Sequence, residues 1–535
     1  MRRLLLFATI GSLISCSSSG SGGSRGSGGS TSAGGSPGSG GSPSSAGGSA
    51  SGGSTGAGGS STGSGGSMAS GGSKGSGGSA SGAGGSVLGS GGSKGSGGAS
   101  SSSSANFTVN VTLSTAIPTV AIVTWSVDVS IDSAAIDFGR DAGNFEFQAP
   151  VDLSQSGYRT LLLGMKQQTT YSLRITAMGG GKTYVSNTTT VKTGALTNGL
   201  LPTFTKTDMD ASSLYAGGAF TMNCIGLAGS PGLPGTTSKS VAFILDKDAD
   251  VVWGLDLTST AATNCSRARM SYDGQSMYAG NFANAATNGA IYRIGMDGMG
   301  TGTTWKLPGR SHDFALLPNG HIMYFATDNM QANTTPGTEA VFDLDPSSGN
   351  SSKIYDEQPD FGTLVASNSS PESHTNHLAF SADLQAITIS MLIPSTIAVV
   401  SYPAGKLLST FGGGQSDYSN MTWTWQHGHD VFKDHIWVFN NNMTGNAHVL
   451  GFTYNASSKT ATQTLDYNPG LQNTTFGDVK ELPNGNVFIT YSDTGGFHEI
   501  TKTGTLLRKI TTTTAVAYSE HRATLYGPPP PFAKN

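Results

Sequence analysis

The stretch HDFALLPNGHIMYFAT, residues 312–327, encodes two short apolar strands separated by a tight turn. The turn is Pro318-Asn319-Gly320, and glycine at such a position supplies the positive φ that a tight hairpin requires. The same strand–turn–strand pattern recurs along the chain with the turns Asp-Gly, Ala-Asp, Lys-Asp and again Pro-Asn-Gly. These other copies begin at residues 268, 376, 428 and 477. A hairpin that returns at intervals predicts a repeat architecture.

The spacing of the hairpins is roughly 45–65 residues, which matches the four-stranded blade of a β-propeller. Most hairpins are followed by a second strand pair, such as AVFDLDPSSGNSSKIY from residue 340. VAFILDKDADVVWGLD, from residue 241, is the outer half of an earlier unit. With that unit included, residues 200–535 are predicted to form a six-bladed β-propeller, and seven blades are the alternative. HRATLYGPPP, from residue 521, is expected to help close the ring.

Residues 105–195 contain a separate group of short β segments. TVAIVTWSVD alternates apolar and polar residues, and YRTLLLGMKQQTTYSLRITA holds two strands around a turn at residues 166–168. This pattern predicts a small β-sandwich with a structural role, and TYSLRITA resembles the penultimate strand of a fibronectin type III module. The predicted fold class is therefore all-β: a six-bladed β-propeller preceded by a small fibronectin type III-like β-sandwich.

Residues 1–16 have the pattern of a lipoprotein signal peptide. Arg2 and Arg3 precede a short apolar run, and the end of this segment, LISC at residues 13–16, resembles the bacterial lipobox, whose cysteine is acylated. Ser17, rather than Asp, points to the outer membrane in such lipoproteins. We expect a lipid anchor at Cys16 that holds the protein at the outer membrane, on its periplasmic side or at the cell surface. An ordinary signal peptide with an incidental cysteine is the alternative.

Residues 17–104 are Gly/Ser repeats such as SGGSKGSGGSASGAGGS. Because they offer almost no apolar side chains, we expect a disordered tether. The net charge of −4 and the 12% of charged residues give no polybasic surface, so no nucleic-acid partner is expected. No apolar run reaches the ~18–20 residues of a membrane-spanning helix. Cys224 and Cys265 are expected to form a disulfide in an oxidising compartment, with two separate buried thiols as the alternative.

Histidines gather at the starts of three successive repeats. Of the ten in the chain, five lie there: His312, His374, His377, His427 and His429. The innermost strand of a propeller blade begins near the central channel, so residues at equivalent starts converge there. The repeated imidazoles therefore predict a shared functional site.

These repeats resemble the blades of the bacterial arylsulfate sulfotransferases. The resemblance covers roughly residues 200–530 and is carried, in order, by SHDFALLPNGHIMYF, SHTNHLAFSADLQAITIS, STIAVVSYPAGKLLSTFGGGQSDY, WQHGHDVF and GDVKELPNGNVFITY. It implies a six-bladed propeller with a small N-terminal β-domain. It also implies an enzyme that transfers a sulfuryl group from an aryl sulfate to a phenol, by a ping-pong mechanism through a sulfo-histidine and without a cofactor.

The resemblance also assigns roles to single residues. His427 in QHGH matches the nucleophile, and His429 is a less favoured candidate that would bind substrate. His374 and Asn376 match the family's H-x-N element, as acid and sulfate ligand. His312 matches the first channel histidine.

One position departs from the family pattern. The family has an arginine after the strand that follows H-x-N, and Leu392 stands there in this sequence. A neutral residue removes a bidentate ligand for sulfate. Arg310, two residues before His312, is the candidate that could replace it as a substrate-binding residue.

Two other functions fit the same residues. Alternation along a strand would place His427 and His429 on one face, where a third histidine could complete a zinc site. No Asp, Glu or Cys cluster stands nearby, so we expect no metal. The second alternative is a catalytically impaired propeller lipoprotein that binds a ligand or partner in its channel. Leu392 favours that alternative, whereas the histidine set favours the enzyme.

Overall fold

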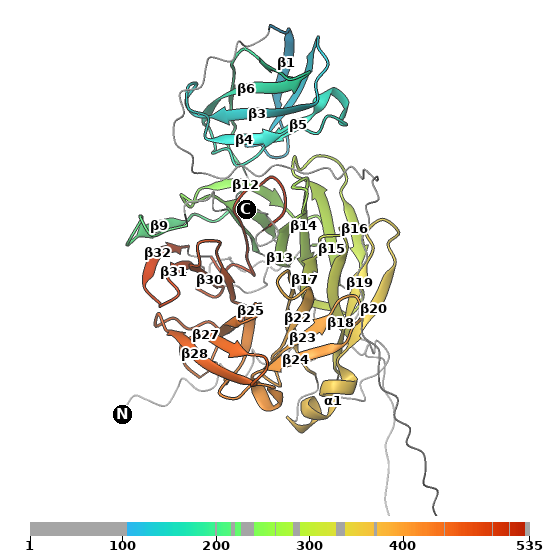
Figure 1. Ribbon diagram of the computed structural model, residues 1–535, viewed down its shortest axis with the longest axis vertical. Helices are drawn as coiled ribbons and strands as arrows, with labels where there is room; N and C mark the ends of the chain where they lie inside the picture. Colours follow the sequence, from blue (N-terminus) through green and yellow to red (C-terminus); the bar gives the residue numbers. More distant parts are fainter. Residues whose placement is uncertain are drawn as a thin grey trace, which may run out of the picture. The chain divides into compact units, whose positions relative to one another are not determined.

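The computed structural model describes residues 104–529, apart from short gaps, and shows an all-β protein (Figure 1). The gaps are residues 198, 200, 216–219, 226–239, 263, 282–288, 328–336, 369–371, 443, 495 and 513. The predicted signal peptide, the lipidation of Cys16 and the Gly/Ser tether lie outside the described residues. Within the described part, no helix combines the length and apolarity needed to cross a membrane.

Two antiparallel sheets form the first part of the chain. The first sheet has the order β1-β2-β5, with β1 (Phe107–Leu113), β2 (Ala121–Val127) and β5 (Thr160–Leu162). The second has the order β4-β3-β6-β7, with β8 also paired to β6; its strands are β3 (Ser133–Gly139), β4 (Phe147–Pro150), β6 (Thr170–Gly179), β7 (Lys182–Val185) and β8 (Thr189–Lys192). Side chains of both sheets share one core that includes Trp125, Phe138 and Tyr171. The burial in β2 alternates, as its sequence predicts.

The rest of the described chain folds into six successive antiparallel sheets, the arrangement of a β-propeller. In five of them the strands follow the order of the sequence: β13 (Cys265–Met270), β14 (Ser276–Asn281), β15 (Ala290–Gly295) and β16 (Thr303–Lys306); β17 (Arg310–Leu316), β18 (Ile322–Thr327), β19 (Glu339–Leu344) and β20 (Ser351–Asp356); β21 (Thr375–Ser381), β22 (Ala386–Met391), β23 (Thr396–Ser401) and β24 (Leu407–Phe411); β25 (Gln426–Val431), β26 (His435–Asn440), β27 (His448–Asn455) and β28 (Thr460–Tyr467); and β29 (Asp478–Glu481), β30 (Val487–Tyr491), β31 (Gly496–Ile500) and β32 (Leu506–Thr511).

Strands from both ends of the propeller sequence complete its sheets. The remaining sheet has the order β12-β11-β10-β33, from β10 (Phe220–Ile225), β11 (Val241–Leu245), β12 (Val251–Asp256) and the C-terminal β33 (Glu520–Arg522). The early strand β9 (Thr205–Asp208) pairs with β32 at the edge of the last sheet. The C-terminal strand therefore helps to close the ring, as HRATLYGPPP predicts, and it pairs with β10 through Met222, Thr221 and Phe220.

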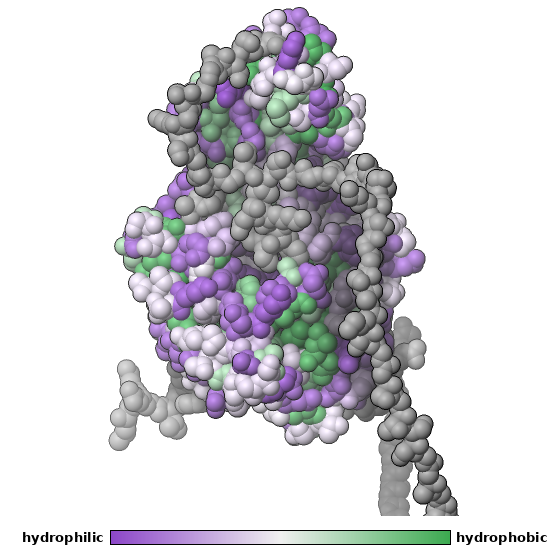
Figure 2. Space-filling view, viewed as in Figure 1, coloured by the Kyte–Doolittle hydropathy of each residue, from purple (hydrophilic) through white to green (hydrophobic). Residues whose placement is uncertain are grey.

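The inner strands pack against one another in sequence and position the candidate site. β13 contacts β17, β17 contacts β21, β21 contacts β25 and β25 contacts β29. The hairpin turns have the expected glycine geometry, with φ of 85° at Gly320 and 84° at Gly485. Burial decreases outward: β17 and β25 are almost fully buried, whereas β20 and β28 are largely exposed. Figure 2 shows hydrophilic residues spread over the viewed face.

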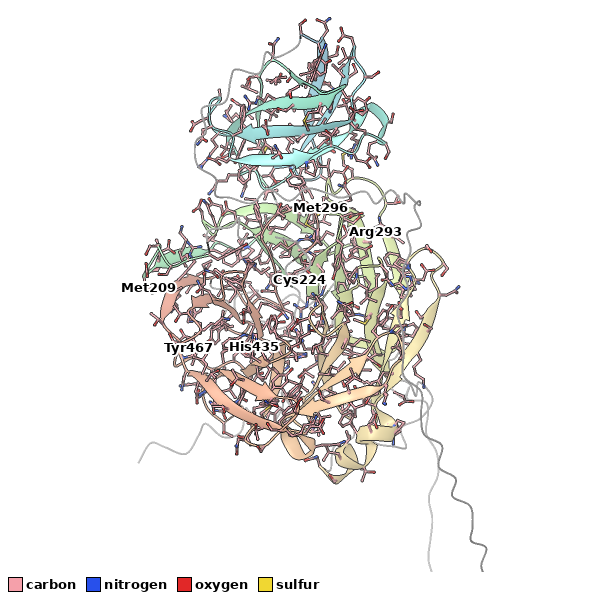
Figure 3. The ribbon with its side chains drawn as sticks, viewed as in Figure 1. Met209, Cys224, Arg293, Met296, His435 and Tyr467 are labelled. Atoms are coloured by element: carbon pink, nitrogen blue, oxygen red, sulfur yellow. A yellow bond between two sulfur atoms is a disulfide. The ribbon has the colours of Figure 1, made fainter. Side chains whose placement is uncertain are left out.

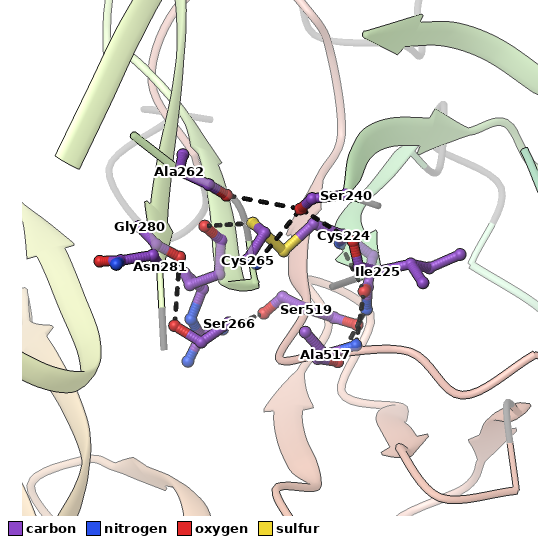
Figure 4. The surroundings of a disulfide bond; sticks show 12 residues. Cys224, Ile225, Ser240, Ala262, Cys265, Ser266, Gly280, Asn281, Ala517 and Ser519 are labelled. Carbon is purple, nitrogen blue, oxygen red and sulfur yellow. Dashed lines mark hydrogen bonds between the residues drawn. A yellow bond between two sulfur atoms is a disulfide. The ribbon is translucent and has the colours of Figure 1, made fainter. Parts of the chain in front are cut away.

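A disulfide joins the first two propeller sheets, as the sequence predicts. Cys224 in β10 and Cys265 in β13 are bonded and fully buried. Figure 3 labels Cys224 among the side chains that fill the interior. The Ser240 hydroxyl beside the bond donates to the Ile225 carbonyl at 3.0 Å and accepts the Cys265 N–H at 3.2 Å (Figure 4).

The sequence did not predict the single α-helix of the described residues. This helix, α1 (Gln358–Ser367), lies between β20 and β21, with a proline in its first turn and Phe361 and Val365 buried. A proline can occupy the first turn because its missing N–H would have no partner within the helix.

Candidate functional site

The structure brings His312, His374 and His427 together at the starts of three neighbouring inner strands. The ring centroids of His312 and His374 are 4.7 Å apart. His312 and His427 are 8% and 5% exposed, so both rings are shielded from water. Phe476 packs edge-on against both of these rings, with centroid distances of 6.3 and 6.4 Å. Three imidazoles and one aromatic ring thus share one end of the channel.

Local backbone geometry aims these side chains. Positive φ angles occur just before three inner strands. The φ is 51° at His374 before β21, 60° at Trp425 before β25 and 51° at Phe476 before β29. Non-glycine residues adopt such values at a cost of about 1–3 kcal/mol, and they do so mainly at functional sites. The pairing register also shifts near the start of β17, β21 and β25. A bulge of this kind changes the direction of the following side chains.

Asn441 fixes the tautomer of His427. The Asn441 amide nitrogen donates to the backbone carbonyls of Asn473 and Phe476, at 3.0 and 2.9 Å. Its Oδ1 must therefore accept, and it lies 2.8 Å from Nδ1 of His427. Nδ1 carries the hydrogen in this arrangement, so Nε2 of the neutral ring keeps its lone pair.

Burial keeps the imidazoles of His312 and His427 neutral. It lowers the pKa of His427 to about 3, although the hydrogen bond with Asn441 acts in the opposite direction. Burial also holds the pKa of His312 well below its usual range, helped by the charges of His374, His427 and Arg310. His374 is more open, with 18% of its side chain exposed, and its Nδ1 lies 3.1 Å from Glu372 Oε1. A neutral nucleophilic nitrogen thus lies near an imidazole that is placed to exchange protons.

Arg310 is a buried cation with spare hydrogen-bonding capacity. Its side chain is fully buried, and Nη1 donates to the backbone carbonyl of Asn281. Among the described residues, its Nε and Nη2 have no hydrogen-bond partner. Burial lowers the pKa of Arg310 to about 10, with Asp313 the group that opposes this shift. Gly280 makes room for the guanidinium, since a Cβ there would lie 2.4 Å from Nη2. A buried guanidinium with free donors is suited to an oxyanion.

The position where the resemblance leads us to expect an arginine lies next to His374. Leu392 is 5% exposed, and its N–H donates to the His374 carbonyl at 3.2 Å. The side chain at this position is therefore uncharged and buried beside the histidine pair. If an anion binds here, its charge has to be balanced by another group.

Asn376 and His429 lie deeper in the wall than the three histidines. The Asn376 amide nitrogen donates to the Gln426 carbonyl at 2.8 Å, and the residue is fully buried. His429 is also fully buried, with Nε2 2.9 Å from the Thr388 hydroxyl and its ring 4.6 Å from that of His377. The structure therefore places His429 beside His377, whereas Asn376 is bonded to the carbonyl of the residue that precedes His427.

The expectation that His427 and His429 share one face is wrong. The register shift between Gln426 and His429 interrupts the alternation, and the two rings have different partners: Asn441 for His427 and Thr388 for His429. Within the described residues, the metal-compatible group of three ligands is Asp246, Asp248 and Asp250.

That aspartate cluster is already occupied by an ammonium group. Lys166 Nζ lies 3.1, 2.8 and 2.5 Å from carboxylate oxygens of Asp246, Asp248 and Asp250. The three carboxylates therefore have a cationic partner from the chain itself, and they lie apart from the channel histidines.

A buried ionic network, not predicted from the sequence, lies one step further along the inner strands. Arg267 pairs with Asp313 through Nε at 2.8 Å and with Asp478 through Nη1 at 2.7 Å. His377 Nε2 lies 3.3 Å from Asp478, and the Tyr518 ring lies 4.6 Å from the Arg267 guanidinium. Asp313 and Asp478 each accept the N–H of the next residue. Asp313 and Asp478 hold equivalent places in two repeats, directly before Phe314 and Val479. This repetition was a signal in the sequence that could have indicated the network.

A second opening lies at the other end of the inner strands. A cavity of about 390 Å³ is lined there by charged and aromatic side chains, including Arg269, Tyr272, Phe432, Lys480 and Glu520. The ionic network occupies the wall between this cavity and the histidine end. The two ends of the channel therefore carry different chemistry.

Comparisons with known proteins give little further information. The sequence matches no protein-family model and no curated protein. Similar solved structures include a streptogramin B lyase (12% identity, 60% of this chain and 98% of that chain, TM-score 0.36) and a catalytically inactive virginiamycin B lyase from Staphylococcus aureus (13%, 58% and 99%, 0.34). Another is a protein of unknown function from Bacteroides caccae (12%, 56% and 98%, 0.36). At these identities and TM-scores, the likenesses bear on neither the reaction nor the site.

Proposed function

We propose that this chain is an aryl sulfotransferase that works through two displacements at His427. The observation that carries the proposal is the geometry of His427: a buried neutral ring whose Nδ1–H is held by Asn441, so that Nε2 keeps its lone pair. The resemblance of the repeats to arylsulfate sulfotransferases supplies the substrate classes, an aryl sulfate donor and a phenolic acceptor.

The first displacement forms a sulfo-histidine. Nε2 of His427 attacks the sulfur, the N–S bond forms, and the bond from sulfur to the aryl oxygen breaks. A proton from His374 neutralises the departing phenolate. In the second displacement the acceptor hydroxyl attacks the same sulfur, the N–S bond breaks, and His374 takes the acceptor's proton. Two steps at one nucleophile avoid holding both phenols in the site together.

The oxygens of the transferring group need positive or hydrogen-bonding partners. We assign this role to His312 and to the buried guanidinium of Arg310, whose Nε and Nη2 have no partner among the described residues. Preorganised donors of this kind stabilise charge that develops during transfer. Arg310 would thus take over the electrostatic role that the family gives to the position of Leu392. We assign Asn376 and His429 to the support of the inner strands.

The architecture belongs to the same proposal. We propose a six-bladed propeller, supported by the six described sheets, and a fibronectin type III-like sandwich over residues 105–195. The Gly/Ser run of residues 17–104 would tether both to a lipid anchor at Cys16 in the outer membrane. The sequence pattern at residues 13–16 supports this placement.

The test is a sulfuryl-transfer assay with the full chain. We expect 4-nitrophenyl sulfate to release nitrophenolate faster when a phenol is added, and the protein alone to gain the mass of one sulfuryl group. His427→Ala should abolish both signals. His321→Ala, at the turn between β17 and β18, should leave both unchanged. Folded protein with no release and no mass gain would disprove the proposal.

The impaired propeller lipoprotein remains the second candidate, and Leu392 favours it. A buried leucine beside His374 is poorly suited to a sulfate group. In that case the channel would bind a ligand without transfer. Binding of 4-nitrophenyl sulfate by calorimetry, with neither release nor a covalent adduct, would identify this alternative.

A further inference from the structure

Two buried carboxyl groups lie behind His312 and His374. Glu339 begins β19 and Glu357 precedes α1, and they are 5% and 0% exposed. Their hydrogen-bond partners are hydroxyls and backbone N–H groups, and no lysine or arginine of the described residues pairs with them. Buried carboxyls without a cation are costly in the charged form, so this pair needs an explanation.

The two carboxyls hold the backbone on either side of the histidines. Glu339 accepts the Ser311 hydroxyl and the Thr375 N–H, both at 2.8 Å. Glu357 accepts the hydroxyls of Ser373 at 2.7 Å and Thr375 at 2.6 Å, and also the Glu339 N–H at 3.0 Å. Ser311 precedes His312, and Ser373 and Thr375 flank His374. The carboxyls therefore connect the two histidine-bearing segments of neighbouring sheets.

The surroundings favour the protonated form of the pair. Burial raises the pKa of Glu357 to about 7, with the charge of Asp356 adding to this shift. Burial, with the charges of Glu357 and Glu372, raises the pKa of Glu339 well above its usual range. Glu372 and Asp356 are the charged groups facing the pair, and His374 faces Glu372 in turn. Full ionisation would place two negative charges in one buried space.

We propose that Glu339 and Glu357 are positioning residues that hold the His312–His374 ring pair while they retain a proton, and that loosen it when both ionise. The effect on rate rests on the proposed function. It predicts a loss of sulfuryl transfer as the pH rises above neutral. Because the pKa values of His312 and His427 lie below their usual range, these two imidazoles titrate on the acid side. The proposed acid His374 is common to every variant, so the difference between the native chain and the glutamine variants carries the test.

Glutamine substitutions mimic the protonated carboxyls. In Glu357→Gln, the amide oxygen can accept from Ser373 and the Glu339 N–H while the amide nitrogen donates to the Thr375 hydroxyl. In Glu339→Gln, the oxygen can accept from the Thr375 N–H while the nitrogen donates to Ser311. Glu499→Gln is the matched control, because Glu499 is 4% exposed and bonds to Tyr215 and Asn486 in another sheet.

The first measurement is the transfer rate between about pH 6 and pH 9, with the same donor and acceptor throughout. We expect the native chain and Glu499→Gln to lose at least about tenfold in rate on the alkaline side. Glu357→Gln and Glu339→Gln should lose much less. Parallel profiles for all four proteins would overturn the proposal.

The second measurement does not depend on activity. Hydrogen exchange of the native full chain, followed by mass spectrometry, reports the protection of the Thr375 amide at each pH after correction for the intrinsic rate. If protection of the Thr375 amide falls on the alkaline side, the positioning role is supported. Absence of sulfuryl transfer in the same protein would count against the proposed function only. Constant protection overturns the role, even if a glutamine variant fails to fold.

Discussion

Asn441 gives His427 a defined chemical state, and this depends on one side-chain amide. The two carbonyls that accept from Asn441 Nδ2 leave only Oδ1 for the imidazole, so Nδ1 of His427 donates and Nε2 keeps its lone pair. The sequence predicts the importance of His427 through its repeat position. It cannot predict the tautomer, because Asn441 lies at the end of a different strand and its orientation depends on a third segment at residues 473–476.

Replacing Asn441 should therefore impair transfer through His427 alone. Asn441→Leu removes the acceptor, leaves the buried Nδ1–H unpaired and costs about 1–3 kcal/mol of stability. We expect kcat to fall roughly tenfold or more, with KM for the donor little changed. Steady-state kinetics with 4-nitrophenyl sulfate check this. Asn486→Leu, at another buried asparagine directly before β30 of the last sheet, should keep the native kcat.

Leu392 provides the opposite test, a gain of function. Leu392→Arg places a guanidinium beside His374, as in the arylsulfate sulfotransferases that the repeats resemble, and under the proposed function it should lower KM for the aryl sulfate by roughly tenfold. Leu392→Met keeps the volume without charge and should leave KM unchanged. An unchanged KM in a folded Leu392→Arg protein would show that Arg310 already meets the need for a cation. Urea unfolding of each variant separates a binding effect from a folding defect.

At the scale of elements, the hairpins follow from the sequence, whereas the side-chain directions at their starts do not. Gly320 adopts the expected positive φ, and each predicted strand–turn–strand unit forms the inner hairpin of a sheet. The bulge near the start of β25 breaks the period-two rule and separates His427 from His429. Bulges and positive φ values at His374 or Trp425 depend on tertiary packing, so local patterns cannot reveal them.

The network around Arg267 should hold the inner strands together. This side chain connects β13 to β17 through Asp313, to β29 through Asp478 and to the C-terminal segment through the Ser519 carbonyl. Arg267→Met would remove the closest cation from two buried carboxylates and leave them only Arg269 and Lys480 at 3.9 and 3.8 Å, so we expect a loss of about 3–5 kcal/mol in the free energy of unfolding. Urea denaturation measures the loss. Arg293→Met, on an exposed position of β15, should change stability by less than about 0.5 kcal/mol.

At the scale of the whole molecule, ring closure uses pairings that no local pattern contains. β9 joins β32 and β33 joins β10, so the first and last sheets each contain strands from distant parts of the chain. The repeated hairpins in the sequence predict how many propeller sheets form and where each one lies along the chain. Which terminal segment completes which sheet depends on the geometry of the closed ring, and the sequence predicts only that the C-terminal segment takes part.

The buried histidines should make the whole molecule sensitive to acid. Burial lowers the pKa of His427 to about 3 and those of His377, His498 and His521 to about 4, from an ordinary value of 6.5. Between these values the unfolded chain binds more protons than the folded one, so stability falls as the pH drops from about 6.5 toward 4. Glu357 acts in the other direction, because its pKa is raised to about 7 and the folded state holds its proton longer.

These opposing groups predict maximum stability in mildly acidic to neutral solution. We expect the urea midpoint to fall steeply below about pH 6, because four buried imidazoles gain protons on unfolding. The stabilisation from Glu357 is lost as the pH rises from about 4.5 to 7, so it partly opposes the effect of the histidines in this range. His521→Gln should reduce the acid slope, whereas Glu357→Gln should make it steeper, because the opposing contribution of Glu357 is removed. A midpoint that stays constant between pH 6.5 and 4 would contradict the buried, neutral state of the imidazoles, including that of His427.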